Sequence, residues 1–387
     1  MEIQIQFFEY INEQYFDSDD SSDMVKGAHV CFYKLSSNYS RNGSLYDHGE
    51  LIFKRNGKAR DVSFLNIGDG DEQEQISEQI FHLTSMVSDR VLLRPWMVAY
   101  CKHNKEGTSG WWTLCYDRFD ISLSDWKDKV NSKSLSDPNK VDLKIGFRCL
   151  CDYWCRTIRK LIKAISHIHD EGIFHGSLRA MTSYVFAGDT LKIMNIGGGL
   201  IEGDKVAFQD FKDLSWMLKS LLRPVLSSDT EWRELTSFLC CFNTKVQDYK
   251  KYVKMLKHPF LMAPDRRMKY FGELHHKLKT THKELRSDLN SSKDFGEFFN
   301  WNTTAAINSL ESFFIKVFNY ERAKPYKGRP SDLLKFLRNV YEHFMDRSTA
   351  DNEEVDIEEV DIKEVDAAVR RHWEGFLDRV HVLFSTY

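Results

Sequence analysis

The sequence is poor in cysteine and has no long apolar run. Its 8 cysteines among 387 residues are too few for a disulfide scaffold, and a reducing compartment would keep them as thiols. No apolar run approaches the roughly 18 residues that a membrane-spanning helix needs. Residues 1–16 also lack the basic start and the small-residue cleavage site of a signal peptide. We therefore expect a cytoplasmic protein without a membrane partner.

The sequence also has no large excess of positive or of negative charge. The formal net charge of −3 excludes a uniformly basic nucleic-acid binder, so any contact with RNA must be local. The chain is 42% hydrophobic and 29% charged, which suits two or three packed domains.

Three of the cysteines, Cys149, Cys151 and Cys155, form a cluster in the sequence. Their spacing matches no usual zinc site, and they lie in a helical apolar run with Trp154. We expect core cysteines and no bound metal, and a metal-ligand set is the less favoured alternative.

The first 125 residues resemble a small α+β unit. Short β segments such as 28–35 and 50–53 accompany one predicted helix over 74–88. From about residue 142 to 170 the pattern is helical, and Gly172 follows where the helix should end.

A hairpin-like stretch runs from residue 174 to 200 around the turn at Gly188, and helices dominate from there to the C-terminus. Two polar stretches interrupt them. We interpret residues 287–293 as a loop. The acidic run 351–366 is typical of a solvated, mobile insertion, and a dedicated binding motif is the alternative.

A kinase-like signature lies in the hairpin. His175 and Leu178 stand in a segment similar to the protein-kinase catalytic loop, and residues 192–197 lie where the D-F-G motif belongs. Phosphoryl transfer needs a carboxylate base, magnesium ligands and a lysine on the phosphates. Neutral residues occupy all four positions: Ser177, Thr182, Asn195 and Leu65.

Two further absences agree with this interpretation. No G-x-G-x-x-G motif precedes the strand that carries Leu65. Only about 18 residues separate Asn195 from Asp213, which resembles the aspartate that opens a large helix in kinases. We therefore expect a pseudokinase that retains the fold, buttressed by His175, but has no kinase activity.

A second polar constellation lies on a helix predicted to begin at Pro330 and Ser331. At 100° per residue, an apolar stripe forms on one face, and Asp332, Asn339 and His343 fall within about 40° of one another on the other. The stripe comprises Leu333, Leu334, Leu337, Val340, Tyr341, Phe344 and Met345. Arg338 and Lys335 flank the polar group. The alternative is a solvated face with pairs such as Arg338 with Glu342.

The segment YKGRPSDLLKFLRNVYEHF, residues 326–344, resembles the kinase-extension nuclease (KEN) family. This family includes ribonuclease L and the unfolded-protein-response sensor kinase-endoribonuclease, and the resemblance covers about residues 262–387. It implies an α+β protein: a bilobal protein-kinase-like fold followed by an all-α nuclease domain. We expect an extension over 1–24, a pseudokinase over 25–265 with its first lobe ending near 125, and the KEN domain over 266–387.

The activity implied by the resemblance is RNA cleavage by attack of a 2′-hydroxyl on its adjacent phosphate, without metal or cofactor. His343 is then the general acid, because an imidazole has a reference pKa of about 6.5. Tyr326 is the base or proton relay, Arg338 clamps the phosphate and Asn339 orients it. Asp332 supports the helix or the arginine. Trp301 matches a family tryptophan or is a plain core aromatic.

The implied partners are RNA, not DNA, and a second copy or a related kinase-endoribonuclease in a dimer. Residues 266–347 hold 16 Lys and Arg against 10 Asp and Glu, which makes this region locally basic. An inactive scaffold that pairs with an active relative is the competing hypothesis.

Overall fold

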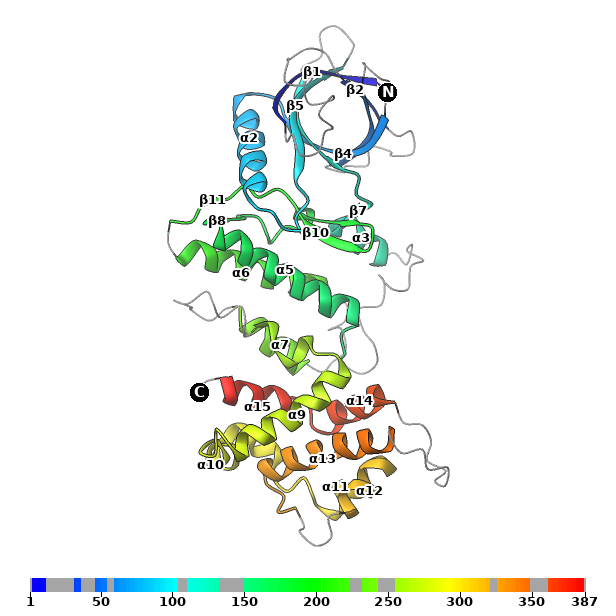
Figure 1. Ribbon diagram of the computed structural model, residues 1–387, viewed down its shortest axis with the longest axis vertical. Helices are drawn as coiled ribbons and strands as arrows, with labels where there is room; N and C mark the ends of the chain where they lie inside the picture. Colours follow the sequence, from blue (N-terminus) through cyan, green and yellow to red (C-terminus); the bar gives the residue numbers. More distant parts are fainter. Residues whose placement is uncertain are drawn as a thin grey trace. The chain divides into compact units, whose positions relative to one another are not determined.

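The structure is a computed structural model that describes residues 2–11, 31–35, 46–53, 59–103, 110–131, 149–202, 204–222, 232–242, 255–320, 326–348 and 361–385. These residues form a mixed α+β protein, so the expected class is confirmed (Figure 1). By their contacts, the residues divide into two compact units. Unit 1 is Met1–Ser136, Lys160–Leu221 and Lys245–Tyr249; unit 2 is Asp137–Arg159, Leu222–Thr244 and Lys250–Tyr387. The boundary expected at residue 265 does not coincide with this division.

Unit 1 begins with six antiparallel strands closed into a barrel in the order β1, β2, β3, β4, β6, β5. Residues 2–11, part of the expected N-terminal extension, form a barrel strand that pairs with both β2 and β5. Of the strand expected over 28–35, residues 31–35 are β2, and 28–30 lie outside the described residues. The strands are β1 Glu2–Ile11, β2 Cys31–Leu35, β3 Tyr46–Phe53, β4 Ala59–Gly68, β5 Pro95–His103 and β6 Trp111–Asp117.

One helix packs on this barrel. Helix α2, Asp71–Met86, buries Ile80, Phe81 and Leu83 and contacts β4, β5 and β6. It confirms the predicted helix and begins three residues earlier. Its first turn carries Asp71, Glu72 and Glu74, and acidic side chains at this end are favoured by the helix dipole.

The rest of unit 1 holds the predicted hairpin. Strands β9, Tyr184–Ala187, and β10, Thr190–Ile193, pair around Gly188, whose φ of 57° lies in the left-handed region that favours glycine. The remaining elements are β7 Ile121–Ser122, α3 Leu123–Asn131, α5 Asp152–Asp170, β8 Ile173–Phe174, η2 Met181–Ser183, β11 Gly199–Leu200 and α6 Asp204–Leu222. Helix α5 is divided between the units after Arg159.

The described part of unit 2 is helical. Its elements are α7 Arg233–Cys240, η5 Pro259–Leu261, α9 Pro264–Lys279, α10 Leu285–Ser291, η6 Lys293–Phe298, α11 Thr304–Asn308, α12 Ser312–Tyr320, α13 Pro330–Ser348, α14 Ile362–His372 and α15 Phe376–Ser385. None of the described helices in either unit is both long and apolar enough to cross a membrane.

Two expectations for this region are wrong in part. Residues 287–291, expected in a loop, belong to α10, because Leu285 and Leu289 are buried and hold that turn against the core. The end of the expected acidic insertion is also ordered. Asp361 caps α14 by accepting the amide of Lys363 at 3.0 Å, and Asp366 inside that helix is buried. Residues 349–360 lie outside the described residues.

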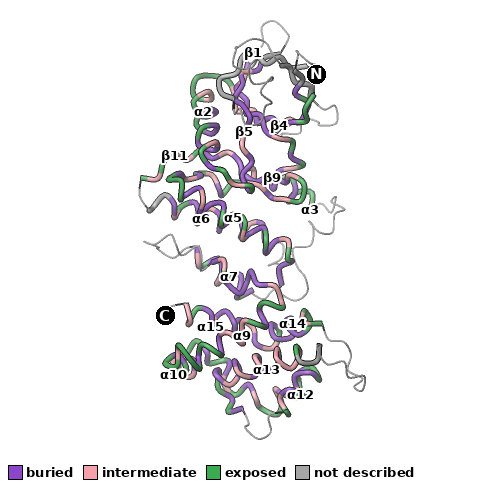
Figure 2. The backbone as a smooth tube through the Cα atoms, viewed as in Figure 1, coloured by how far each residue is buried: buried purple, intermediate pink, exposed green. Residues whose placement is uncertain are grey.

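Aromatic residues pack together in the core of unit 2, whose buried stretches on α9, α13 and α14 appear in Figure 2. At its centre Phe336 is stacked on Trp301 at 5.1 Å between ring centroids and meets Trp373 edge-on at 5.9 Å. Aromatic pairs in such geometries add about 0.5–1.5 kcal/mol each to the gain from burial alone. This centre positions Tyr326, whose ring lies 5.5 Å from both Trp301 and Phe336.

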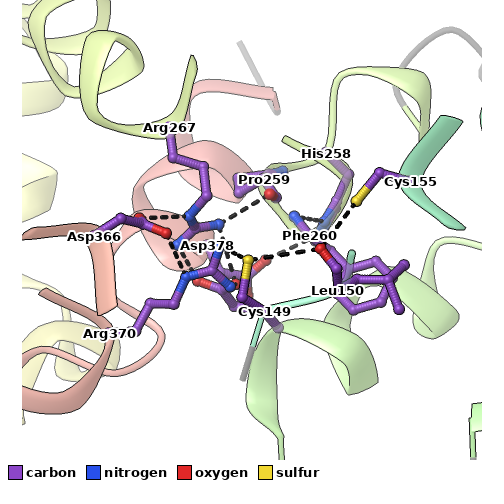
Figure 3. Close-up of polar contacts among 11 residues, drawn as sticks. Cys149, Leu150, Cys155, His258, Pro259, Phe260, Arg267, Asp366, Arg370 and Asp378 are labelled. Atoms are coloured by element: carbon purple, nitrogen blue, oxygen red, sulfur yellow. Dashed lines mark hydrogen bonds and ion pairs between the residues drawn. The ribbon is translucent and has the colours of Figure 1, made fainter. Parts of the chain in front are cut away.

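Four buried charged side chains, Glu234, Arg267, Asp366 and Arg370, form what we call the ion cluster. Figure 3 labels three of them, Arg267, Asp366 and Arg370. Arg267 donates to Glu234 at 2.7 Å and to Asp366 at 3.0 Å. It also donates to the carbonyl of Pro259 at 2.9 Å. Arg370 donates to Asp366 at 2.8 Å. The cluster therefore joins α7, α9 and α14.

Candidate functional site

Helix α13 carries most of the predicted site and begins at Pro330, as expected. Leu333, Leu334, Leu337 and Val340 of the predicted stripe are fully buried, while Met345 is 40% exposed and does not belong to it. The opposite face was expected to be polar, with a solvated face as the alternative. It is partly covered, because Phe336 on this face is fully buried and Asn339 is 4% exposed. The reason is that α13 packs against α9 and also against α10, α12 and η6.

Hydrogen bonds connect three of the predicted residues. The side-chain amide of Asn339 donates to the hydroxyl of Tyr326 at 2.9 Å, and Arg338 donates to the amide oxygen of Asn339 at 2.8 Å. Arg338 also pairs with Glu342 at 2.5 Å, which is the i,i+4 pair considered as the alternative. The ammonium of Lys335 lies 5.3 Å from the centre of the Tyr326 ring. A phenol, an amide and a guanidinium therefore lie in one hydrogen-bonded row.

His343 lies one helical turn beyond Asn339 and is half-buried. Its imidazole meets the ring of Tyr320 edge-on, with centroids 4.8 Å apart. Within the described ranges, no hydrogen bond reaches the imidazole. The structure thus links Arg338 and Tyr326 through Asn339 and leaves the half-buried imidazole of His343 one helical turn away.

The loop that carries Tyr326 is held from both sides. Asp332 accepts the amide of Lys327 at 3.0 Å, and Asn302 donates to the carbonyl of Tyr326 at 2.6 Å. Trp301 is buried in the core and donates its indole N–H to the carbonyl of Arg329 at 3.2 Å. Asp332 and Trp301 therefore position the tyrosine loop rather than the arginine.

Gly328 is required in this loop. Its φ is 69°, and a Cβ added there would lie 2.4 Å from Oδ1 of Asn302, so a side chain would meet both backbone strain and a steric clash. The tight turn keeps Tyr326 close to the start of α13.

Sequence reasoning missed His275, a buried histidine on α9. Burial, followed by the positive charges of Lys279, Arg338, Arg286 and Lys335, lowers the pKa of His275 to about 4. This histidine is therefore neutral at physiological pH and is surrounded by cations that can attract a phosphate. Its position three and four residues from Leu278 and Phe271, on the apolar face of α9, is the sequence signal for its burial.

In unit 1, one carboxylate holds the segment that resembles the kinase catalytic loop. Asp210 of α6 accepts the backbone amides of His175 at 2.6 Å and Gly176 at 2.9 Å, and it contacts the ring of His169 at 3.0 Å. Sequence reasoning selected Asp213, which instead accepts from the side chain of Gln209 at 2.7 Å. Of these two aspartates, only Asp210 lies on the buried face of α6.

The four neutral positions in unit 1 contact protein groups. The hydroxyl of Tyr116 donates to the side-chain oxygen of Asn195 at 2.6 Å, and Tyr46 donates to the carbonyl of Thr182. Leu65 is buried in the same apolar cluster as both tyrosines. The fourth, Ser177, lies beside His175, with Oγ and Nδ1 3.2 Å apart.

The three clustered cysteines are buried. Burial raises the pKa of Cys155 to about 12, and Arg370 contacts the sulfur of Cys149 at 3.5 Å. Among the described residues, no group of three or more His, Cys, Asp or Glu side chains is arranged to hold a metal ion.

A cavity of about 360 Å³ lies on another side of Trp301, where Phe298 and Trp373 also line it. Tyr326, Arg338 and His343 are not among its lining residues, so the cavity is separate from the row of polar groups on α13. The polar row, together with His343 one turn away, is the stronger candidate site because it combines a cation, a hydrogen-bond donor and two titratable groups.

A comparison of the sequence with models of known protein families gives no match, and a comparison with curated proteins also gives none.

Proposed function

We propose that this chain is an endoribonuclease of the kinase-extension type, which cleaves RNA by 2′-hydroxyl transesterification. The observation that carries the proposal is the hydrogen-bonded row of Arg338, Asn339 and Tyr326, with His343 one turn away on the same helix. The motif over residues 326–344 supports the same assignment.

In the proposed reaction, the 2′-oxygen attacks the adjacent phosphorus and the bond to the 5′-oxygen of the next nucleotide breaks. Tyr326 takes up the 2′-hydroxyl proton as the phenolate, or as a neutral phenol relays it to solvent water, and the protonated His343 gives a proton to the leaving 5′-oxygen. Arg338 and Asn339 donate hydrogen bonds to the phosphate oxygens as negative charge develops on them. The products are a 2′,3′-cyclic phosphate and a 5′-hydroxyl.

The test is incubation of the purified full chain with a structured RNA in EDTA, followed by identification of the product ends. Cyclic phosphate and 5′-hydroxyl ends support the proposal. If the folded protein cuts none of a panel of structured RNAs, the proposal is wrong.

A scaffold without nuclease activity is the second candidate, and one observation favours it. Glu342 pairs with Arg338 at 2.5 Å and so partly neutralises the charge proposed to clamp the phosphate. In the nuclease proposal, an incoming phosphate must displace this exposed pair, which is a modest barrier because exposed pairs are worth about 0–1 kcal/mol.

We further propose that residues 25–265 form a pseudokinase with a bilobal kinase-like fold. The contacts of Asp210 with the backbone of His175 and Gly176 support this, because they anchor the segment that resembles the catalytic loop. The hydroxyls of Tyr46 and Tyr116 bond to the positions where magnesium ligands would be needed. This supports a domain that maintains its fold without transferring phosphate.

The pseudokinase proposal predicts little or no binding of ATP and magnesium, since Leu65, Thr182 and Asn195 supply neither a phosphate-binding cation nor a carboxylate for the metal. A thermal-shift titration up to millimolar ATP should therefore leave the melting temperature unchanged. Stabilisation follows RT ln(1 + [L]/Kd), so a gain of roughly 2.7 kcal/mol at 1 mM would imply a Kd near 10 μM and contradict the proposal.

We propose that the active form is a dimer, as the KEN resemblance implies. Specific nuclease activity should then fall on dilution, because dissociation separates the partners. Activity and light-scattering mass are measured across the same dilution series. A flat activity profile with a monomer mass would exclude the dimer requirement, and activity restored only by a related kinase-endoribonuclease would identify a heterodimer.

A further inference from the structure

Tyr320, the last residue of α12, is 76% exposed and is the most exposed large apolar side chain among the described residues. Its ring meets the imidazole of His343 edge-on, with centroids 4.8 Å apart and the planes at 69°. Two residues earlier, Phe318 is stacked on Tyr326 with centroids 5.5 Å apart. The end of α12 thus places one aromatic ring against each of the two residues proposed to move protons.

Core packing accounts for Phe318 but not for Tyr320. Helix α12 is anchored by Phe313, Phe314 and Val317, which are buried. Tyr320 adds nothing to that core, and within the described part of the chain its hydroxyl has no hydrogen-bond partner. A single exposed aromatic residue is ordinary by itself. This one also contacts the proposed general acid, so its exposed ring adjoins the groups proposed to react.

We propose that Tyr320 is the stacking platform for the RNA base immediately 3′ of the cleaved bond, an inference that rests on the nuclease function proposed above. In that reaction His343 protonates the leaving 5′-oxygen, which belongs to the nucleotide on the 3′ side. This nucleotide must lie beside His343, where the Tyr320 ring is open to its base.

The platform specifies a class of substrate. An aromatic side chain stacks on a base that is unpaired and turned out of its helix, and it does so with little dependence on sequence. The base on the 3′ side of the cleaved bond must therefore be unpaired when it binds. Lys316, exposed one turn before Tyr320 on the same face of α12, supplies a positive charge for the backbone phosphate that follows the stacked base.

The test uses the full chain and an RNA hairpin whose cleaved bond is first mapped with the wild-type protein. The hairpin is then made with a 2′-deoxy nucleotide before that bond, which blocks cleavage, and with fluorescent 2-aminopurine on its 3′ or its 5′ side. Because stacking quenches 2-aminopurine, we expect wild type and Tyr320→Phe to quench the 3′ probe and Tyr320→Ala to leave it bright.

Kinetics with the cleavable hairpin provide a second readout. Tyr320→Ala should raise KM about tenfold, since stacking on one base contributes about one order of magnitude to affinity, whereas kcat should change little. Tyr320→Phe keeps the ring and should restore KM. Asn319→Ala truncates the neighbouring exposed residue and is the matched control. All three variants alter exposed positions, so they should melt like the wild type.

Each outcome separates the inference from the proposed function. Cleavage with equal quenching by wild type and Tyr320→Ala, or quenching of the 5′ probe alone, overturns the stacking role and leaves the nuclease in place. A lowered kcat with unchanged KM and quenching also overturns it, because Tyr320 would then only support His343. If the folded wild type cuts no hairpin, the proposed function and this inference fall together.

Discussion

RNA cleavage should fall about 10²–10⁴-fold when His343 is replaced by alanine, because the leaving 5′-oxygen then departs without a proton. The protein should remain folded. His343 is half-buried, and in the described part of the chain no hydrogen bond depends on its imidazole, so its removal leaves no buried partner unsatisfied. The measurement is single-turnover cleavage in EDTA, with circular dichroism to verify the fold.

The matched control is His282→Ala. His282 is another partly exposed histidine of unit 2, 3.5 Å from Glu284, and it lies outside the proposed site. Its variant should cleave RNA at the wild-type rate. If His343→Ala cleaves RNA as fast as the wild type, the enzyme proposal is wrong and the scaffold proposal replaces it.

Arg338→Ala tests the same site through charge instead of proton transfer. Loss of one positioned donor to a developing oxyanion lowers kcat by about 10²–10³-fold, so a comparable loss is expected here. Arg371→Ala is the matched control, because Arg371 is an exposed arginine paired with Glu311 at 2.8 Å, much as Arg338 is paired with Glu342. A 2′-deoxy nucleotide at the cleaved position should block the reaction with the wild type, since it removes the nucleophile.

Replacing Arg267 with methionine should destabilise unit 2 by about 3–5 kcal/mol, the usual cost of removing one partner from a buried ion cluster. Arg267 is 1% exposed and donates to two carboxylates and one backbone carbonyl. Methionine fills a similar volume but leaves Glu234, among the described residues, with Arg370 at 3.5 Å as its one ion-pair partner. The measurement is the urea midpoint and slope of unfolding.

The neighbouring arginine provides a sharp control. Arg266 pairs with Glu273 at 2.5 Å, but its side chain is 45% exposed, so Arg266→Met should cost only about 0–1 kcal/mol. The two variants delete the same chemical group one residue apart on α9. If Arg267→Met and Arg266→Met lose equal stability, burial of the ion cluster does not determine its contribution to the free energy of unfolding.

The ion cluster also predicts how stability depends on pH. Burial acts to raise the pKa of Glu234, but the charges of Arg267 and Arg370 outweigh it, so the folded-state pKa lies below the ordinary value. A lowered carboxylate pKa contributes stability above the unfolded-state pKa of about 4.3, and this contribution is lost as the pH falls through the folded-state pKa. Wild-type stability should therefore drop below about pH 4, and the drop should be shallower in Arg267→Met.

Local sequence patterns were sufficient for several elements. The 3.6-residue period from Leu333 to Val340, with a proline at the first turn, located α13. The Gly188 turn between two short apolar runs located the β9–β10 hairpin. In each case the information lies within about 20 residues, because helical periodicity and turn chemistry depend on near neighbours.

The errors share a different cause. Asn339 lies on the face of α13 that was expected to be polar, yet it is buried, because other helices cover that face. The sequence pattern pointed to Asp213, but the structure has Asp210 holding the loop, because this role depends on which face of α6 is turned inward. Residues 287–291 were expected in a loop, but Leu285 and Leu289 pack into the core and make them helical. The pattern of polar residues in the sequence therefore did not reveal which side chains other elements would bury.

By itself, the sequence determined the mixed α+β class, the start of α13 and the candidate residues Tyr326, Arg338, Asn339 and His343. Only the tertiary structure decided that the first three share one hydrogen-bonded row and that Tyr320 lies against His343. It also decided that Glu234, Arg267 and Asp366, separated by 33 and 99 residues, form one buried cluster. The physical reason is that periodicity describes one helix at a time, whereas burial and pairing of polar groups depend on contacts between elements that are remote along the chain.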